Sequence, residues 1–336
     1  MPIAYDREYF ENKSRLKLIQ AERRIEQIHK NHPAIKELDS EINRLKNRYR
    51  RHRIEKMSEG EVEELKALIR EKEKAREELL AKKGLPVNYK EPEWDCPRCQ
   101  DLGKYLVDGK YQLCQCAREH YQHLIRKDAR LPSKLQQATF ANARLNLYSN
   151  KQKTPDGESW RDKASSVYSK AYFFSRNYQP ENPMRGLIIE GPVGSGKSFL
   201  LGCIANQLLE RGVPVKYIVY GDLLRKIRAS YDSSDLPSED QLLHEVQEVP
   251  VLLIDDLGTE NTSEFSATIL YQIIDRRYRE ELPLILTTNH PLNTLQERFS
   301  IMNERIFQRL LEMCRYLELV GDVRSKIVEK LQGGEG

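Results

Sequence analysis

The segment from Gly191 to Ser198 carries the clearest chemistry in this 336-residue chain. It reads Gly-Pro-Val-Gly-Ser-Gly-Lys-Ser, the complete pattern of a phosphate-binding loop. Glycines let successive backbone N–H groups turn toward phosphate oxygens without a Cβ in the way. Lys197 brings a positive charge to the β- and γ-phosphates, and the Ser198 hydroxyl is a ligand for Mg²⁺. The segment therefore predicts a site for a nucleoside triphosphate with magnesium, rather than a plain glycine turn.

The residues on either side of this loop predict the elements that hold it. The apolar run 186–190 is typical of a short buried strand, and the run 199–209 is typical of a helix. A helix that starts at a glycine-rich turn points its first backbone N–H groups at an anion. The residues expected to contact the nucleotide are Gly191, Pro192, Val193, Gly194, Ser195, Gly196, Lys197, Ser198 and Phe199.

Two carboxylates end a later apolar run, Val251-Leu-Leu-Ile-Asp-Asp. Ligands gather at the carboxyl ends of parallel strands, where a magnesium ion beside the phosphates must be held. Asp255 is expected to bind Mg²⁺ directly or through water, and Asp256 to orient the water that attacks the γ-phosphate. An ordinary acidic turn between a strand and a loop is the alternative for this pair.

Polar residues also follow the next predicted strand, 284–289. Asn289 at its end is expected to contact the γ-phosphate, with helix capping as the alternative. Arg305 and Arg309 are four residues apart and so share one face of a predicted helix. Arg309 is the better candidate for a cation that reaches the γ-phosphate on a neighbouring subunit, and a surface salt bridge is the alternative. Arg324 is expected to reach the nucleotide of its own subunit.

Four of the six cysteines are clustered, as Cys96-Pro-Arg-Cys99 and Cys114-Gln-Cys116. Two thiolate pairs on either side of a β-like stretch that contains glycine are typical of a zinc ribbon or knuckle. The second pair has one residue between its cysteines instead of the commoner two, so His120 or His123 could supply the fourth ligand. Four ligands predict a structural zinc that fixes a small fold with few apolar residues. Free thiols or redox chemistry are the alternatives.

Composition divides the chain into four segments. The first is rich in charge and carries apolar residues at three- and four-residue steps, which predicts a helical hairpin or coiled coil with a narrow seam. Pro33 fits the first turn of a new helix, so a break just before it is expected. The expected segments are a partner-binding helical arm at 1–84, a zinc-binding module at 85–130, a linker and approach at 131–180 and a nucleotide domain at 181–330.

Charge and hydropathy exclude two classes of protein. The net charge of +4 is too small for a strong binder of polyanions, so any nucleic-acid surface must be local. No apolar run approaches the ~20 residues of a membrane span, and the N-terminus lacks a signal-peptide pattern. Clustered cysteines without an export signal favour metal binding over disulfides. A cytoplasmic protein without a membrane partner is expected.

The succession of these motifs resembles the AAA+ ATPases, and among them the DnaC/DnaI-type loaders of bacterial replicative helicases. The helper ATPases of insertion-sequence transposition are near relatives. The resemblance covers roughly residues 94–326, and the cysteine cluster is similar to loaders of Gram-positive type. Besides the phosphate-binding loop, it rests on Leu-Leu-Ile-Asp-Asp-Leu-Gly, Thr-Thr-Asn, Glu-Arg-Ile-Phe-Gln-Arg and Gly-Asp-Val-Arg at 252–258, 287–289, 304–309 and 321–324.

The resemblance implies that the nucleotide domain has the α/β fold of an AAA+ P-loop NTPase, a parallel sheet flanked by helices. The expected fold class is this domain preceded by the small zinc-binding module and the coiled-coil-like N-terminal segment, which is longer than the family pattern. The resemblance also implies contact with single-stranded DNA by the element around Lys226, Arg228 and Tyr231, since cations and a stacking aromatic suit that ligand. Apart from the resemblance, these three residues would be a solvated helix face. The implied roles are Walker A for Lys197 and Ser198, Walker B for Asp255 and Asp256, sensor 1 for Asn289, arginine finger for Arg309 or Arg305, and sensor 2 for Arg324.

One departure from the family pattern concerns hydrolysis. Most AAA+ proteins carry Glu where Asp256 stands, so the shorter side chain predicts slow hydrolysis and an ATP switch more than a motor. The expected function is an ATP-dependent loader that binds the hexameric replicative DNA helicase, self-associates through its AAA+ domains and helps to place the helicase on single-stranded DNA. Its cofactors would be ATP, Mg²⁺ and Zn²⁺. The alternatives are a transposition helper that acts on target DNA with a transposase, and an interaction protein that binds ATP with little turnover.

Overall fold

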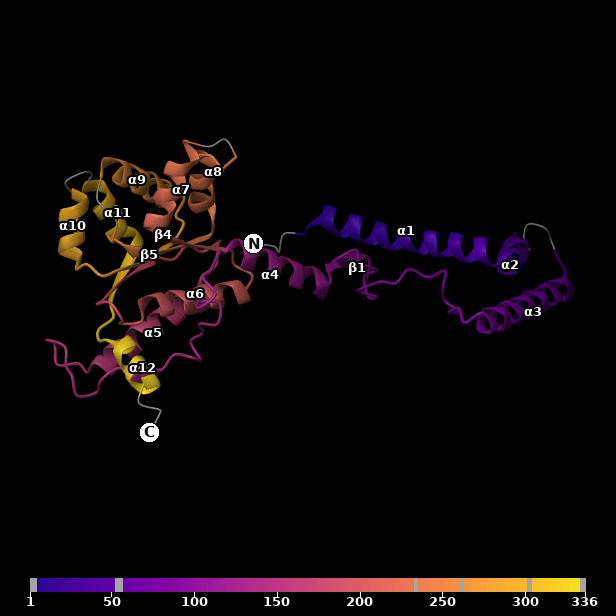
Figure 1. The fold of residues 1–336 in the computed structure, drawn as a ribbon, viewed down its shortest axis with the longest axis horizontal. Coiled ribbons are helices and arrows are strands. Elements are labelled where there is room, and N and C mark those ends of the chain that lie inside the picture. The colour runs from indigo at the N-terminus through magenta and orange to yellow at the C-terminus, as the bar shows by residue number, and fades with distance from the viewer. Residues whose placement is uncertain (1–4, 52–56, 233–234, 260–262, 301–303, 333–336) are drawn as a thin grey trace. The chain divides into compact units, whose positions relative to one another are not determined.

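The computed structural model describes residues 5–51, 57–232, 235–259, 263–300 and 304–332 (Figure 1). These residues belong to two compact units. The N-terminal unit is Tyr5–Arg118, and the C-terminal unit starts at Glu119. Residues 1–4 and 52–56 of the predicted helical arm lie outside the described residues. No described helix is both long and apolar enough to cross a membrane.

A five-stranded parallel sheet is the centre of the C-terminal unit. Its strands lie in the order β4, β5, β6, β3, β7, and every neighbouring pair is parallel. Parallel pairing brings the carboxyl ends of all the strands to one edge of the sheet, where the predicted site residues follow β3, β5 and β6. The strands are β3 Gly186–Glu190, β4 Val215–Val219, β5 Val251–Leu257, β6 Leu284–Thr288 and β7 Cys314–Glu318.

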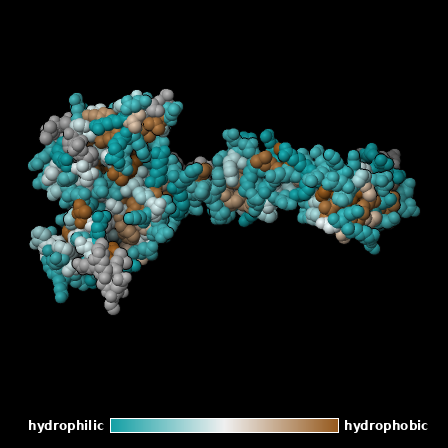
Figure 2. Space-filling model, viewed as in Figure 1, coloured by the Kyte–Doolittle hydropathy of each residue, from teal (hydrophilic) through white to brown (hydrophobic). Residues whose placement is uncertain are grey.

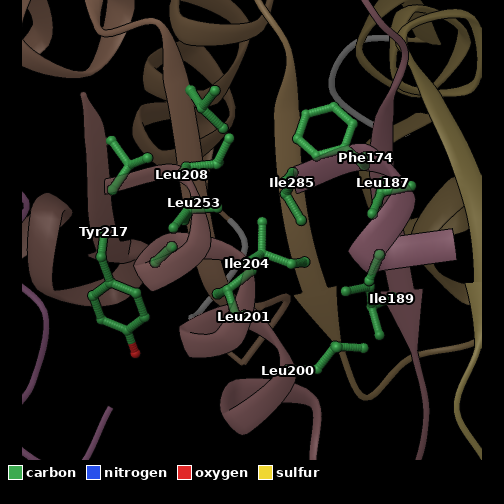
Figure 3. Packing of buried hydrophobic residues seen from close by; sticks show 14 of the residues in the cluster. Phe174, Leu187, Ile189, Leu200, Leu201, Ile204, Leu208, Tyr217, Leu253 and Ile285 are labelled. Atoms are coloured by element: carbon green, nitrogen blue, oxygen red, sulfur yellow. The ribbon is translucent and has the colours of Figure 1, made fainter. Parts of the chain in front are cut away.

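Helices cover both faces of this sheet because successive strand residues point to opposite sides. On one face of the sheet, Leu187 and Ile189 belong to an apolar cluster with Leu200, Leu201 and other residues of α6 (Figure 3). Ile188 belongs to a second apolar cluster, on the opposite face. On the first face lie α4 Gln115–Asp128 (from Glu119 on), α5 Trp160–Asn177 and α6 Lys197–Glu210; on the second lie α7 Tyr220–Ser230, α8 Glu239–Glu248, α9 Glu264–Arg279, α10 Leu292–Ser300 and α11 Glu304–Met313. The predicted fold class is confirmed.

The helix α5 and the strand β7 are among the elements of this unit that have no counterpart in the sequence predictions. The helix α5 lies within the segment expected only as an approach to the nucleotide site. It buries Ala164, Val167, Ala171 and Phe174, a stripe at helical spacing that packs in the same cluster as α6. The edge strand β7 is short, and its alternation is interrupted by two exposed residues. A weak pattern over five residues does not distinguish a strand from a loop.

Three helices make up most of the N-terminal unit: α1 Arg7–Asn31, α2 Pro33–Arg51 and α3 Glu59–Lys82. The predicted break before Pro33 is present, and Ser58 caps α3 in a reciprocal pair of hydrogen bonds with Glu61. The helices α2 and α3 are antiparallel, and three ion pairs join them: Asp39 with Arg76, Glu41 with Lys72, and Lys46 with Glu73. Figure 2 shows a largely hydrophilic surface over these helices, with small groups of hydrophobic side chains.

Candidate nucleotide and metal sites

The loop between β3 and α6 has the conformation that its glycines predict. Gly194 and Gly196 have φ angles of 86° and 97°, which side chains with a Cβ rarely adopt. At Gly191 the obstacle is space, since a Cβ there would lie 2.1 Å from the carbonyl oxygen of Leu319. The chain therefore needs glycine at these positions to wrap the loop closely around a ligand.

Lys197 lies at the first turn of α6, with its ammonium group directed back into the loop. Its Nζ donates hydrogen bonds to the carbonyl oxygens of Gly191 and Pro192 at 2.7 and 2.9 Å, and to Oδ1 of Asn289 at 2.6 Å. Burial lowers the pKa of Lys197, although the nearby carboxylates of Asp256 and Asp255 favour its charged form. A buried cation held by neutral oxygens is suited to exchange them for an anionic phosphate.

Asp255 lies at the end of β5 and is buried among hydroxyl groups. Ser198 Oγ donates to Oδ1 at 3.1 Å, so the two expected magnesium ligands lie side by side. Carboxylate and hydroxyl oxygens are ligands that Mg²⁺ prefers, and the ion keeps several of its waters. These two residues could therefore hold magnesium next to the phosphates, as the sequence predicts.

Asp256 follows in a backbone conformation that is uncommon for a residue with a side chain. Its φ angle is 55°, and its N–H donates to Oγ1 of Thr287 at 2.9 Å. Asn289 Nδ2 donates to its Oδ1 at 3.4 Å. Burial and the charge of Asp255 raise the pKa of Asp256, against the opposing effect of Lys197. The carboxylate thus lies beside Asn289 and faces the ligand site, where it can accept a proton or a hydrogen bond from water.

These groups line a cavity of about 690 Å³, large enough for a nucleotide. The predicted residues in its wall are Val193, Gly194, Gly196, Lys197, Ser198, Phe199, Asp256, Asn289 and Arg324. The wall also includes Val323 of the 321–324 motif, Ile327, and five residues from the segment before the sheet: Asn142, Arg144, Leu147, Tyr148 and Tyr168. The hydroxyl of Tyr148 donates to the Ser195 carbonyl at 2.7 Å, and burial raises the pKa of Tyr148 to about 12. The segment before the sheet therefore completes the cavity.

Arg324 and Arg309 have different positions relative to the cavity. Arg324 begins α12 Val323–Gln332, donates its backbone N–H to the Gly194 carbonyl at 3.1 Å and lines the cavity. Arg309 on α11 forms an ion pair with Asp275 of α9 and lies over the rings of Tyr271 and Tyr278 at 5.3 and 5.2 Å. The other candidate finger, Arg305, is exposed on the same helix, and neither α11 arginine lines the cavity.

The residues proposed to touch DNA lie at the second half of α7. Lys226 and Arg228 are exposed, and Arg228 covers the ring of Phe265 at 4.9 Å. Tyr231 at the C-terminal end of the helix is 60% exposed, and its hydroxyl hydrogen-bonds Glu239. Two cations and an accessible ring therefore share one end of this helix.

The four clustered cysteines converge in the N-terminal unit. Their sulfur atoms all lie within 4.8 Å of one another, with 3.6 Å between Cys96 and Cys114 and 3.4 Å between Cys99 and Cys116. Sulfurs around one tetrahedral zinc are about 3.8 Å apart for Zn–S bonds of ~2.3 Å. His120 and His123 do not belong to this group within the described residues, so cysteine supplies all four candidate ligands.

A β-hairpin positions the second cysteine pair. The strands β1 Lys104–Val107 and β2 Lys110–Leu113 are antiparallel and joined by Asp108 and Gly109, whose φ angles of 48° and 77° fit a two-residue turn. The Gly103 N–H donates to Cys99 Sγ at 3.3 Å. Burial raises the pKa of Cys99, so a bound cation would favour its thiolate form. The cluster can hold a zinc ion.

Comparisons with known proteins agree with this geometry. Residues 179–330 match the family model described as IstB-like ATP binding protein. The replicative helicase loader DnaC of Escherichia coli (strain K12) is 32% identical over 123 residues, which are 37% of this chain and 49% of that protein. The replicative helicase loader DnaI of Bacillus subtilis (strain 168) is 26% identical over 161 residues, 45% of this chain and 51% of that protein. The chain thus spans about half the length of these curated relatives.

Solved structures of similar proteins include a crystal structure of DnaI, at 26% identity and a TM-score of 0.44, over 58% of this chain and 95% of that one. A crystal structure of the DnaC helicase loader matches at 22% identity and a TM-score of 0.46, over 56% of this chain and 99% of that one. Residues 179–330 therefore match an IstB-like ATP-binding model, and part of the chain is similar in sequence to the DnaC and DnaI helicase loaders.

Proposed function

We propose that this protein is an ATP-dependent loader that binds the hexameric replicative DNA helicase and helps to place it on single-stranded DNA. The observation that carries the proposal is the convergence of Lys197, Ser198, Asp256 and Asn289 at one cavity, with Asp255 hydrogen-bonded to Ser198, in a chain that is similar in part to helicase loaders. The homology supports the loader role, and the cavity supports ATP as its cofactor.

The cavity residues divide the work of hydrolysis. The γ-phosphate takes the place of the oxygens that now surround Lys197 Nζ, and this frees Asn289 to contact the phosphate. Ser198 and Asp255 would hold magnesium, which would supply neutralisation of charge on the phosphates. Asp256 orients a water whose oxygen forms a bond to the γ-phosphorus as the bond to the β–γ bridging oxygen breaks. Arg324 approaches the same phosphates from α12.

We place self-association at α11. Arg309 is the arginine finger for the nucleotide of a neighbouring subunit, because it lies on α11 and not in its own cavity. In the single chain its guanidinium pairs with Asp275, so assembly must exchange that carboxylate for a phosphate. Hydrolysis would then depend on protein concentration, and with Asp256 in place of glutamate it would be slow.

The variant Arg309→Ala tests this assignment. It should retain nucleotide affinity but lose the rise in ATPase rate per subunit as protein concentration increases. The matched control is Arg279→Ala, which removes another arginine that pairs with Asp275 and should keep the rise. Equal rates per subunit at low and high concentration in the wild type would contradict a finger supplied by a neighbour.

The remaining surfaces are assigned to the two macromolecular partners. Lys226, Arg228 and Tyr231 would follow single-stranded DNA through backbone charges and base stacking. The helices of the N-terminal unit and its four-cysteine module would bind the helicase, with zinc fixing the module. A narrow apolar seam and a charged surface suit a protein partner.

Recovery of partners from a lysate of the host, with and without ATP, tests the function as a whole. The expected result is the replicative helicase, with recovery changed by ATP and insensitive to ATP in Lys197→Ala. A transposase in its place would support the second candidate, a transposition helper, which the match to the IstB-like family favours. Recovery of neither partner would contradict both and leave an ATP-binding interaction protein.

A further inference from the structure

Asp255 accepts hydrogen bonds from three different hydroxyl groups. Ser198 Oγ and Thr287 Oγ1 donate to Oδ1 at 3.1 and 2.5 Å, and the Tyr217 hydroxyl donates to Oδ2 at 2.7 Å. Ser198 belongs to the phosphate-binding loop, and Thr287 lies on β6, one strand away from Asp255. Tyr217 comes from β4 on the other side of β5 and belongs to no motif of the sequence. The carboxylate is therefore held from both neighbouring strands.

The ring of Tyr217 is fixed by its surroundings. It is 8% exposed and lies at the margin of the apolar cluster that covers the first face of the sheet, with its oxygen at the end away from the cluster (Figure 3). The strand β4 is the edge of the sheet, and its outer side is closed because the Tyr217 N–H donates to the Ala129 carbonyl at 3.0 Å. The preceding residue, Lys216, is buried and pairs with Asp128 and Glu245 at 2.8 and 3.0 Å.

The hydroxyl of Tyr217 acts as a donor to a charged group. The phenol O–H is the donor in its 2.7 Å hydrogen bond to the carboxylate of Asp255. Hydrogen bonds to charged groups are stronger than neutral ones, and those of a buried group are costly to lose. With Oδ2 engaged by Tyr217, the carboxylate cannot rotate freely, and Oδ1 stays directed at Ser198.

We propose that Tyr217 is a positioning residue that sets the orientation of the Asp255 carboxylate toward magnesium. The inference rests on the proposed ATP–Mg²⁺ function of the cavity. Tyr217 does not touch the nucleotide, and it is absent from the cavity wall. Its removal should therefore weaken the effect of magnesium on nucleotide binding and leave the binding of metal-free nucleotide unchanged.

The experiment compares Tyr217→Phe with Tyr178→Phe in the full chain. Tyr178 is also buried, but its hydroxyl donates to the Pro250 carbonyl at 3.2 Å, away from the cavity. The affinity for a fluorescent ATP analogue is measured as a function of Mg²⁺ concentration and in excess chelator. For Tyr217→Phe, the Mg²⁺ concentration that gives half of the change in analogue affinity (the Mg²⁺ midpoint) should be roughly tenfold higher than for the wild type. The affinity of this variant for the analogue in excess chelator should be unchanged. Tyr178→Phe should keep the Mg²⁺ midpoint of the wild type even where its melting temperature falls.

An unchanged Mg²⁺ midpoint in folded Tyr217→Phe would overturn the proposal, as would an equal loss of affinity with and without Mg²⁺. If that variant does not fold, Thr287→Val removes the donor from the opposite strand and must shift the Mg²⁺ midpoint in the same direction; no shift overturns the proposal. Failure of the wild type to bind the analogue at all would instead contradict the proposed function. The two failures are therefore distinguishable.

Discussion

The two units of the molecule hold their functional residues by different means. In the C-terminal unit, Leu252, Leu253 and Ile254 are wholly buried in the middle of the sheet, and large apolar clusters cover both faces. In the N-terminal unit, a small apolar cluster that includes Ile28 and Ile35 is supplemented by polar and thiol groups. Burial of apolar area is insensitive to pH or metal, whereas charged pairs and metal ligands are not. The units should therefore respond to different perturbations.

The carboxylate of Asp39 is the clearest example in the N-terminal unit. It is 2% exposed and lies 2.7 Å from His29 Nε2 and 3.4 Å from an Arg76 nitrogen, and it also pairs with Tyr89 and Lys90. Its partners come from α1, α3 and the segment after α3. The buried carboxylate of Asp39 thus fixes the positions of α1, α3 and the segment after α3 around α2. The narrow apolar seam between the helices does not by itself specify those positions.

Loss of metal should have the largest effect, and only on the N-terminal unit. The purified protein is expected to contain one zinc per chain, and Cys99→Ser or a strong zinc chelator should unfold the module, since structural zinc contributes on the order of 10 kcal/mol. Metal analysis and limited proteolysis measure this. The affinity for ATP should change less than about twofold, because the apolar core holds the cavity. Less than about half an equivalent of zinc after gentle purification would contradict a zinc site.

The converse test is Lys197→Ala, which should affect only the C-terminal unit. Affinity for ATP should fall by about 100-fold, equivalent to about 2.8 kcal/mol, because the phosphates lose their buried cation. Titration with a fluorescent nucleotide measures the loss. Zinc content and helical circular dichroism should match the wild type; a loss of either would mean that the units do not respond separately.

Acid should destabilise the N-terminal unit through Asp39. Burial alone would raise the pKa of Asp39, but hydrogen bonds from Lys90, Tyr89 and His29 outweigh it and hold the pKa below its ordinary value. The contribution of Asp39 is therefore complete above the unfolded-state pKa of ~3.9 and is lost as pH falls through the lower folded-state pKa. At pH 7, Asp39→Asn should lower the free energy of unfolding by about 3 kcal/mol.

Hydrogen exchange of α1–α3 at pH 7 and pH 3 separates this effect from general acid denaturation. Wild type should lose protection in acid, while Asp39→Asn should already have lost it at pH 7. The control Asp95→Asn alters exposed ion pairs with Lys13 and Lys17 and should leave the protection of the helices close to that of the wild type. Equal protection of the wild type and Asp39→Asn at pH 7 would show that the apolar seam alone holds the helices.

The smallest effect is expected from Asp256→Glu, which restores the residue that most AAA+ proteins carry. Asp tolerates the left-handed backbone at this position better than Glu, so the change should cost about 1 kcal/mol of stability. The longer carboxylate should raise the ATPase rate, by less than about tenfold because the backbone must adapt. Single-turnover hydrolysis and a thermal melt measure both effects. A faster enzyme with no loss of stability would show that the backbone does not favour aspartate.

Most of the nucleotide site was predictable because its residues follow strands. Asp255, Asp256 and Asn289 end apolar runs, and parallel pairing brings such ends together. Tyr217 and Arg144 were not predictable, because their roles arise from neighbours that are distant in sequence and share no motif. The choice of ligands at the cysteine cluster also depended on the hairpin turn, which fixes where Cys114 and Cys116 point.

The contacts of Lys197 make ATP binding an exchange reaction. Its Nζ already has three oxygen partners within the protein, so an incoming phosphate displaces them and gains only the difference between the two sets of contacts. The Asn289 side chain also donates to Asp256, so a change in its position on nucleotide binding would alter the contacts of the Asp256 carboxylate. A nucleotide that lacks a γ-phosphate offers fewer oxygens in exchange, so ADP should replace these contacts of Lys197 less completely than ATP. The two nucleotides should therefore differ both in their affinity for the site and in the contacts that Lys197 and Asn289 make when each is bound.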